Sequence, residues 1–208
     1  MLQRGFWRFS QNRPPRHELP GVGRVVMMAG QKGGVGKSTL AFNTATALAN
    51  MGARTAVFDG SAHSPTLTTL AGTEETKHLV DPDFNIFPIS SCGVETISLG
   101  NVLPPEKFVS WTGREAGTLI CDLLARSVFS DLDYLIIDTP STGGDLFTAM
   151  AMTLQVDGAI LVTTTSKVSR EAAGRCIAAL RNVGLPILGI VENFSSTLSP
   201  SCKKSLQV

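Results

Sequence analysis

Apolar residues along this chain gather in short unbroken runs, and the longer stretches between them repeat apolar positions at helical spacing. The runs that predict strands are residues 25–29, 54–58, 84–89, 94–99, 134–137, 159–162 and 186–191. The stretches that predict helices are residues 40–50, 113–129, 145–154 and 170–183. Such alternation is typical of βαβ units. We therefore expect an α/β fold with a mostly parallel central sheet, whose chemistry lies at the carboxyl ends of the strands.

A glycine-rich stretch separates the first predicted strand from the first predicted helix: residues 31–39 read Q-K-G-G-V-G-K-S-T. This is the context of a phosphate-binding loop, in which backbone N–H groups and the helix dipole meet phosphate oxygens. In such a loop Lys37 reaches the β- and γ-phosphates, and the Ser38 hydroxyl binds Mg²⁺. The residues expected to bind ATP are Gly33, Gly34, Val35, Gly36, Lys37, Ser38 and Thr39. The alternative, a chance glycine-rich turn, leaves the match of residues and context unexplained.

Two predicted strands are followed at once by an aspartate, Asp59 in one case and Asp138 in the other. Beside a phosphate loop, such carboxylates meet Mg²⁺ directly or through its waters, because the ion is usually held by one or two carboxylates and the substrate phosphates. The run before Asp138, Y-L-I-I, predicts a strand that is buried on both faces. The alternatives are a strand-end cap for Asp138 and a turn-forming role for Asp59.

Composition limits the class of protein. The chain has 208 residues, of which 43% are hydrophobic, and this predicts one domain with a sizeable core. A formal net charge of +1 argues against a dedicated nucleic-acid binder, because no basic excess is present to neutralise phosphates. No apolar run approaches the ~18 residues of a transmembrane segment. Four scattered cysteines form no C-x-x-C pair and predict reduced thiols: Cys92, Cys121, Cys176 and Cys202.

The start of the chain differs in character from the rest. Residues 1–13 hold three arginines, several bulky apolar residues and no acid. Organelle transit peptides have this composition, and a frayed basic terminus explains it as well. We expect a protein of the mitochondrial matrix if the segment is a transit peptide, and a cytoplasmic protein otherwise.

The glycine-rich loop departs from the usual phosphate-loop pattern at its start. Its first position is Gln31 instead of glycine, and Lys32 adds a second lysine. This resembles the deviant Walker A loop of the SIMIBI ATPases. Residues 138–145, D-T-P-S-T-G-G-D, and residues 189–195, G-I-V-E-N-F-S, are similar to segments of the Mrp/NUBPL-type P-loop ATPases. The chain is on these grounds identified as a divergent member of that family.

The resemblance implies a three-layer P-loop NTPase fold and a homodimer that carries iron–sulfur clusters or delivers them to client proteins. Lys32 would cross the dimer interface to the partner's nucleotide, and charges delivered in this way are worth roughly 10³–10⁵ in rate. Asn193 would read the adenine base, because a side-chain amide both donates and accepts. The plainer alternatives are a solvated Lys32 and a turn-capping Asn193. The implied catalytic residues are Lys32, Lys37 and Asp59, and the implied metal-binding residues are Ser38, Asp138 and Cys202.

Two departures put ATP hydrolysis in doubt. Where the family has D-A-D-I-x-G-P-S, residues 59–66 read D-G-S-A-H-S-P-T, so Ser61 replaces the aspartate that positions the attacking water. Losing a general base typically costs roughly 10²–10⁴ in rate. Thr142 stands where the family has a glycine whose N–H meets the γ-phosphate. We expect ATP binding to survive where hydrolysis is weak.

A third departure concerns the iron–sulfur cluster. Residues 199–202 read S-P-S-C where the family has C-P-x-C, so a dimer would offer two thiolates instead of the four that a [4Fe–4S] cluster normally needs. Serine is a poor replacement, because its hydroxyl is a hard, protonated ligand. Cys202 is therefore either a cluster ligand or an inert thiol. We divide the chain into an extension (1–20), a P-loop ATPase domain (21–195) and a degenerate cysteine segment (196–208), and the resemblance implies further elements beyond it.

Three functions are compatible with these patterns. The first is an ATP-binding and ATP-hydrolysing iron–sulfur carrier that nucleotide switches between dimer states. The second is a ParA/MinD-like positioning ATPase, which Gln31 and Lys32 favour and the near-neutral charge opposes. The third is a nucleotide-binding pseudoenzyme that scaffolds other proteins, favoured by Ser61, Thr142 and Ser199.

Overall fold

The computed structural model describes residues 19–103, 113–140, 150–151, 154–198 and 205–207. Thr142, Cys202, most of the predicted helix at 145–154 and nearly all of the predicted N-terminal extension lie outside these residues. Import into mitochondria, the effect of Thr142 and the role of Cys202 therefore stay predictions.

A seven-stranded sheet runs through the described part of the chain, in the order β3-β4-β2-β5-β1-β6-β7. Its strands are β1 (Val22–Ala29), β2 (Thr55–Asp59), β3 (Ile89–Ser91), β4 (Val94–Ile97), β5 (Leu132–Asp138), β6 (Gly158–Thr164) and β7 (Ile187–Asn193). Every neighbouring pair is parallel except β3 and β4, which confirms the predicted mostly parallel sheet. Strand β1 lies between β5 and β6, so the glycine-rich loop leaves the carboxyl edge near the middle of the sheet.

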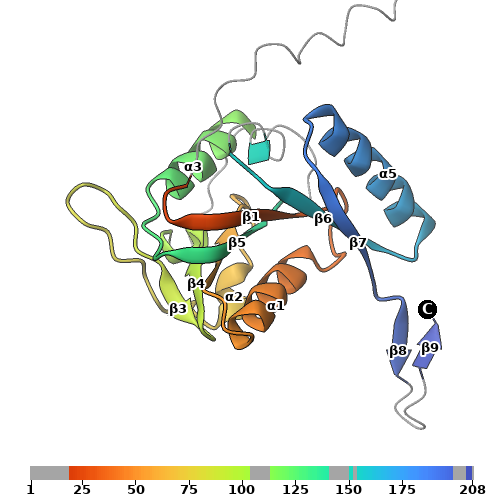
Figure 1. Ribbon diagram of the computed structural model, residues 1–208, viewed down its shortest axis with the longest axis horizontal. Coiled ribbons are helices and arrows are strands. Elements are labelled where there is room, and N and C mark those ends of the chain that lie inside the picture. The colour runs from red at the N-terminus through yellow and green to blue at the C-terminus, as the bar shows by residue number, and fades with distance from the viewer. Residues whose placement is uncertain (1–18, 104–112, 141–149, 152–153, 199–204, 208) are drawn as a thin grey trace, which may run out of the picture.

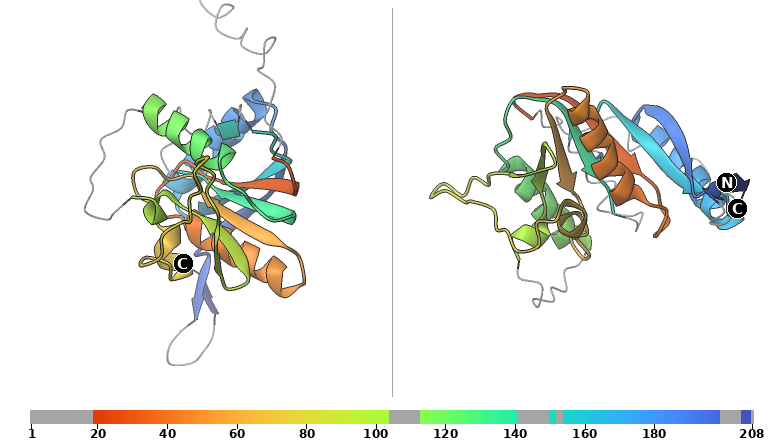
Figure 2. Two further views of the ribbon diagram at one scale, coloured as in Figure 1. Left: turned by 90° about the vertical axis from the view of Figure 1, so that its left-hand side faces the viewer. Right: turned by 90° about the horizontal axis from the view of Figure 1, so that it is seen from below.

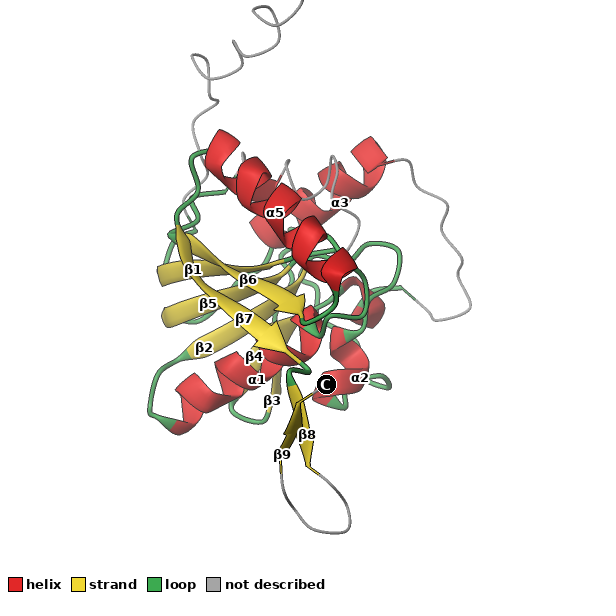
Figure 3. Ribbon diagram, turned by 90° about the vertical axis from the view of Figure 1, so that its right-hand side faces the viewer, coloured by secondary structure: helices red, strands yellow, loops and turns green. Residues whose placement is uncertain are grey.

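Helices cover both faces of this sheet. They are α1 (Lys37–Asn50), α2 (Leu67–Ala71), the 3₁₀ helix η1 (Leu99–Asn101), α3 (Gly113–Ala125) and α5 (Lys167–Asn182). Helices α3 and α5 lie on one face, and α1 and α2 lie on the other (Figures 1 and 3). The arrangement confirms the expected three-layer α/β fold.

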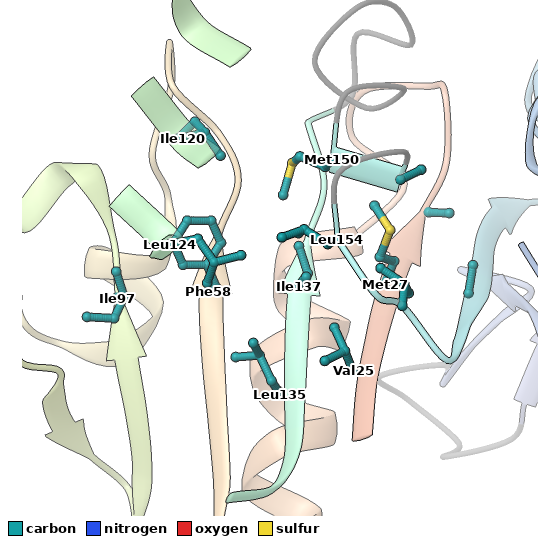
Figure 4. Close-up of a cluster of buried hydrophobic side chains, with 14 of the residues drawn as sticks. Val25, Met27, Phe58, Ile97, Ile120, Leu124, Leu135, Ile137, Met150 and Leu154 are labelled. Atoms are coloured by element: carbon teal, nitrogen blue, oxygen red, sulfur yellow. The ribbon is translucent and has the colours of Figure 1, made fainter. Parts of the chain in front are cut away.

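The core has two parts, one on each side of the sheet. Phe58, Ile120, Leu135 and Ile137 are fully buried between the sheet and α3 (Figure 4). Ile136, between the last two of these residues in sequence, packs into the second cluster under α1 and is 1% exposed. Strand β5 is thus buried on both faces, as its continuous apolar run predicts.

The prediction of a strand over residues 84–89 is wrong. Strand β3 begins only at the last residue of that run, and Phe84 has a left-handed backbone with a φ of 63°. The cause is local, because the Asp81 carboxylate accepts hydrogen bonds from the backbone N–H groups of Asp83 and Asn85. These bonds close a turn where the apolar pattern alone predicts extended chain.

The predicted helix at 113–129 is shorter than its apolar pattern suggests. Helix α3 ends at Ala125, and the chain beyond it pairs with another segment. The Arg126 carbonyl accepts a hydrogen bond from the N–H of Ile86, and the Ile86 carbonyl accepts one from the N–H of Val128. Tertiary pairing therefore takes backbone groups that a longer helix would have used.

The segment at 196–208 contains secondary structure that the sequence analysis missed. Strands β8 (Ser196–Leu198) and β9 (Ser205–Gln207) pair antiparallel and project from the layered body (Figures 2 and 3). Like α2, these strands are too short for hydrophobic periodicity to reveal. Across the described segments, no helix combines the length and the apolar character that crossing a bilayer requires.

Candidate functional site

The loop of residues 31–39 has the backbone of a phosphate-binding loop. Gly34 and Gly36 have φ angles of 75° and 92°, in the left-handed region that glycine tolerates best. A Cβ atom on Gly36 would also overlap the side-chain amide nitrogen of Asn193. Helix α1 begins at Lys37 with neither a side-chain cap nor an acidic residue in its first turn. The N–H groups of that turn are therefore left for an anion.

Lys37 lies folded against the loop and is 5% exposed. Its Nζ donates to the carbonyl oxygen of Lys32 at 3.2 Å, and Lys32 itself is half-buried. Burial lowers the pKa of Lys37 below its ordinary value, while the negative charge of Asp138 acts in the opposite direction. The ammonium is held where a phosphate oxygen would be a stronger, charge-assisted partner than a carbonyl.

The two strand-end aspartates lie side by side, because Asp59 and Asp138 are register partners at the ends of β2 and β5. Both residues are at most 1% exposed. Asp59 accepts hydrogen bonds from the N–H of Ser61 (2.9 Å), the N–H of Leu67 (3.2 Å) and the hydroxyl of Ser98 (3.0 Å). Burial raises the pKa of Asp59, and these three donors oppose the rise.

Asp138 is different, because neither of its carboxylate oxygens has a hydrogen-bond partner among the described residues. Burial first, and the negative charge of Asp59 second, raise the pKa of Asp138 to about 7. The Ser38 hydroxyl, which lies near the carboxylate without the geometry of a hydrogen bond, and the Lys37 ammonium both act in the opposite direction. A buried carboxylate without donors is costly unless a cation compensates it.

Magnesium fits this arrangement. Mg²⁺ takes oxygen ligands, typically one or two carboxylates together with substrate phosphates and water. Asp138 offers two unused oxygens, Ser38 offers a hydroxyl beside them, and Asp59 supplies a second negative charge on the next strand. An ion held by these residues would neutralise the phosphate oxygens of a nucleotide.

A cavity of about 490 Å³ opens over the loop, a volume in the range of small-molecule sites (roughly 300–1,000 Å³). The loop side of the cavity comprises Gly34, Gly36, Lys37, Ser38 and Thr39. The other walls include Ser61, His63, Thr66, Thr69, Leu70, Thr139 and Pro140. Ser61 thus borders the same cavity as the phosphate loop. The sequence analysis did not identify His63 or Thr66, although their place just after β2 was a usable signal.

Asn193 lies against the phosphate loop at the end of β7. Its Nδ2 donates to the carbonyl oxygen of Val35 at 3.0 Å, and its Oδ1 accepts the N–H of Phe194 at 3.0 Å. One amide hydrogen and one lone pair remain available for another partner. The structure therefore brings Asn193 to the site, together with Lys32, Lys37, Asp59 and Asp138.

The comparison with protein families agrees with this site. The profile of the NUBPL iron-transfer P-loop NTPases matches residues 21–208. The chain belongs to this family. That membership confirms the resemblance carried by the loop and by the segments at 138–145 and 189–195.

Several proteins similar to this member of the NUBPL family are named iron–sulfur cluster carrier proteins. The one from Deinococcus radiodurans is 37% identical over 182 residues, which make up 88% of this chain and 52% of that protein. The one from Methanocaldococcus jannaschii is 39% identical over 188 residues, 89% of this chain and 64% of that protein. The chain thus spans between half and two thirds of the length of these relatives.

Solved structures place the fold among P-loop proteins. A nucleotide-binding protein from Archaeoglobus fulgidus, solved with ADP, aligns with a TM-score of 0.78 at 25% identity, over 90% of this chain and 73% of that one. The cell-division ATPase MinD from Pyrococcus furiosus aligns with a TM-score of 0.56 at 24% identity, over 82% and 71% of the two chains. The second likeness concerns the fold alone.

The cysteines of this NUBPL-family chain form no metal site in the part that the structure describes. Cys92 is exposed, Cys121 is half-buried and Cys176 is buried, and none of these three cysteines forms a disulfide. The described residues contain no group of three or more His, Cys, Asp or Glu side chains that could hold a metal ion. Burial raises the pKa of Cys176 to about 11, which keeps that thiol protonated.

Proposed function

We propose that this chain binds Mg²⁺-ATP at the loop of residues 31–39, hydrolyses it slowly as a dimer and uses the cycle to hand over iron–sulfur clusters. The observation that carries the proposal is the buried Asp138 carboxylate, which lacks a donor among the described residues and lies beside Lys37 and Ser38. The loop chemistry argues for the nucleotide, and the names of the relatives argue for the cargo. Calorimetric titration with ATP in Mg²⁺ tests this proposal, and a titration that shows no heat of binding would contradict it.

Each loop residue has a role in this proposal. The N–H groups of residues 33–36 and of the first turn of α1 bind phosphate oxygens, and Lys37 neutralises the β- and γ-phosphates. Ser38 and Asp138 hold Mg²⁺, with Asp59 alongside. Support comes from the left-handed glycines, the uncapped helix start and the unused carboxylate oxygens.

Hydrolysis is expected to be slow because Ser61 lines the cavity and stands where the family pattern D-A-D-I-x-G-P-S has its second aspartate. A serine hydroxyl can hold a water molecule by hydrogen bonding, but it cannot accept the water's proton as a carboxylate can. The same observation favours a second candidate function, a nucleotide-binding scaffold without turnover. Phosphate release from purified protein separates the two, since bound ATP without release over hours supports the scaffold.

Lys32 is proposed to act on the nucleotide of the partner subunit. We predict that Lys32→Ala lowers ATP turnover roughly 10³-fold or more and leaves ATP affinity unchanged. The affinity is retained because the Lys37 ammonium bonds to the backbone carbonyl of residue 32, which alanine keeps. Phosphate release at saturating ATP and equilibrium binding are the two measurements.

Mixing two inactive variants tests whether this lysine works in trans. A Lys32→Ala chain has an intact phosphate loop, and a Lys37→Met chain can still lend its Lys32. Their mixture should regain the ATP turnover that neither variant shows alone. A mixture of Lys32→Ala with the surface variant Lys77→Ala is the positive control, because the Lys77→Ala chain also provides a Lys32 side chain. Turnover that stays absent in the first mixture would contradict action across a dimer.

The proposed cargo is an iron–sulfur cluster held between two chains by Cys202. Two thiolates leave other iron positions for further ligands, since such clusters normally take four cysteines. We predict that anaerobic reconstitution of the wild-type chain gives visible cluster absorbance and that Cys202→Ala loses it. The exposed thiol of Cys92 provides the matched control, so Cys92→Ala should retain the absorbance. Cluster absorbance in the Cys202→Ala variant equal to that of the wild-type chain would show that Cys202 is not a cluster ligand.

A further inference from the structure

Phe194 is an exposed aromatic residue in an unusual backbone conformation. Phe194 follows β7 directly, is 57% exposed and has a φ angle of 54°. A left-handed backbone is rare for a bulky residue, and an exposed ring stabilises the fold little. Neither feature is explained by folding, and both point to a use of the ring at the site.

The ring reaches the phosphate loop. The Cζ atom of Phe194 lies 3.7 Å from the position that a Cβ atom would take on Gly36, the residue before helix α1. Two hydrogen bonds of Asn193 fix this position, because Nδ2 donates to the Val35 carbonyl and Oδ1 accepts the Phe194 N–H. The left-handed backbone of Phe194 therefore holds its ring beside the loop that would carry the phosphates.

A nucleotide bound on this loop must extend its base past one flank of the loop. Asn193 and Phe194 form a flank with two complementary kinds of contact. The Asn193 amide retains a donor and an acceptor for the edge of a base, and the Phe194 ring offers a flat apolar face. Bases of any kind stack on such a face, because all have a π-surface.

We propose that Phe194 is a stacking platform for the purine base of the bound nucleotide. The inference rests on the proposed function, since it requires a nucleotide on the loop. Asn193 selects the base by hydrogen bonding at its edge, and Phe194 adds affinity without selecting among purines. The ring thereby converts a phosphate-binding loop into a site that prefers a nucleoside triphosphate to a bare polyphosphate.

The test compares Phe194→Leu with Phe84→Leu. Phe84 is a matched control, because it is also exposed (66%), also has a left-handed backbone (φ 63°) and lies on another loop. Calorimetry with Mg²⁺ measures the affinities of ATP, GTP and inorganic tripolyphosphate. Phe194→Leu should lower the affinities for ATP and GTP by a similar factor, about 5- to 150-fold or ~1–3 kcal/mol. The affinity for tripolyphosphate should stay unchanged. Phe84→Leu should change none of the three.

A spectroscopic readout accompanies the affinities. Stacking on the ring should shift the adenine H2 and H8 proton resonances upfield in the wild-type complex, and the shift should be lost in Phe194→Leu. Unchanged ATP affinity in Phe194→Leu, or an equal loss of tripolyphosphate affinity, would overturn the stacking role. A wild-type chain that binds neither ATP nor tripolyphosphate would instead overturn the proposed function itself.

Discussion

Replacing Lys37 by methionine is expected to abolish ATP binding at working concentrations. The ammonium is buried beside the loop, and removing one partner of a buried charge pair costs about 2–5 kcal/mol, or roughly 30- to 5,000-fold in affinity. Methionine keeps the apolar stem, so the substitution leaves little cavity where Lys37 now packs. Binding of a fluorescent ATP analogue, measured by titration in Mg²⁺, gives the result.

The control for this prediction is Lys77→Ala. Lys77 is exposed, its Nζ contacts a backbone carbonyl at 3.4 Å, and it does not line the cavity over the loop. Its removal should leave the titration unchanged. Wild-type affinity in Lys37→Met, with the fold intact by circular dichroism, would show that the nucleotide is not bound at this loop.

Replacing Asp138 by asparagine is expected to stabilise the chain without nucleotide and to remove its use of Mg²⁺. The folded pKa of Asp138 is about 7, well above the ~3.9 of an unfolded aspartate. The folded state therefore binds more protons than the unfolded state between these values, so stability falls as pH rises from about 4 to 7. The difference between the two pKa values corresponds to as much as ~4 kcal/mol in the free energy of unfolding. The Asp138→Asn variant would recover this stability above pH 7.

Urea unfolding at pH 5 and pH 8, without nucleotide, measures this effect. The wild-type chain should lose stability between the two pH values, and Asp138→Asn should lose less, with a residual slope from the raised pKa of Asp59. Asp131→Asn is the control, since that side chain is 81% exposed. An identical pH slope in wild type and Asp138→Asn would contradict the account of the buried carboxylate.

The parts of the fold that the sequence predicts are those with strong local signals. The run before Asp138 is apolar at every position because β5 is buried on both faces, and the glycines of the loop are required by their left-handed backbone. Both signals depend on residues close together in the chain. The mostly parallel sheet and the position of the loop at its carboxyl edge could be predicted from them.

The parts that the sequence does not predict depend on contacts between distant segments or on short polar interactions. The apolar run at 84–89 reads as a strand, yet the Asp81 side chain holds it in a turn. Ser98 donates to Asp59 from 39 residues away, and no pattern around either residue indicates that bond. The stacking role proposed for Phe194 likewise depends on the closeness of its ring to Gly36, which lies more than 150 residues away in the chain.

We propose that ATP binds at the phosphate loop through a magnesium ion that Asp138 helps to hold. The most direct test of this proposal is calorimetric titration of the wild-type chain with ATP at pH 8, once in Mg²⁺ and once in EDTA. We expect one ATP bound per chain in Mg²⁺ and an affinity at least about tenfold lower in EDTA. Absence of binding in Mg²⁺, or equal affinity in both buffers, would contradict it.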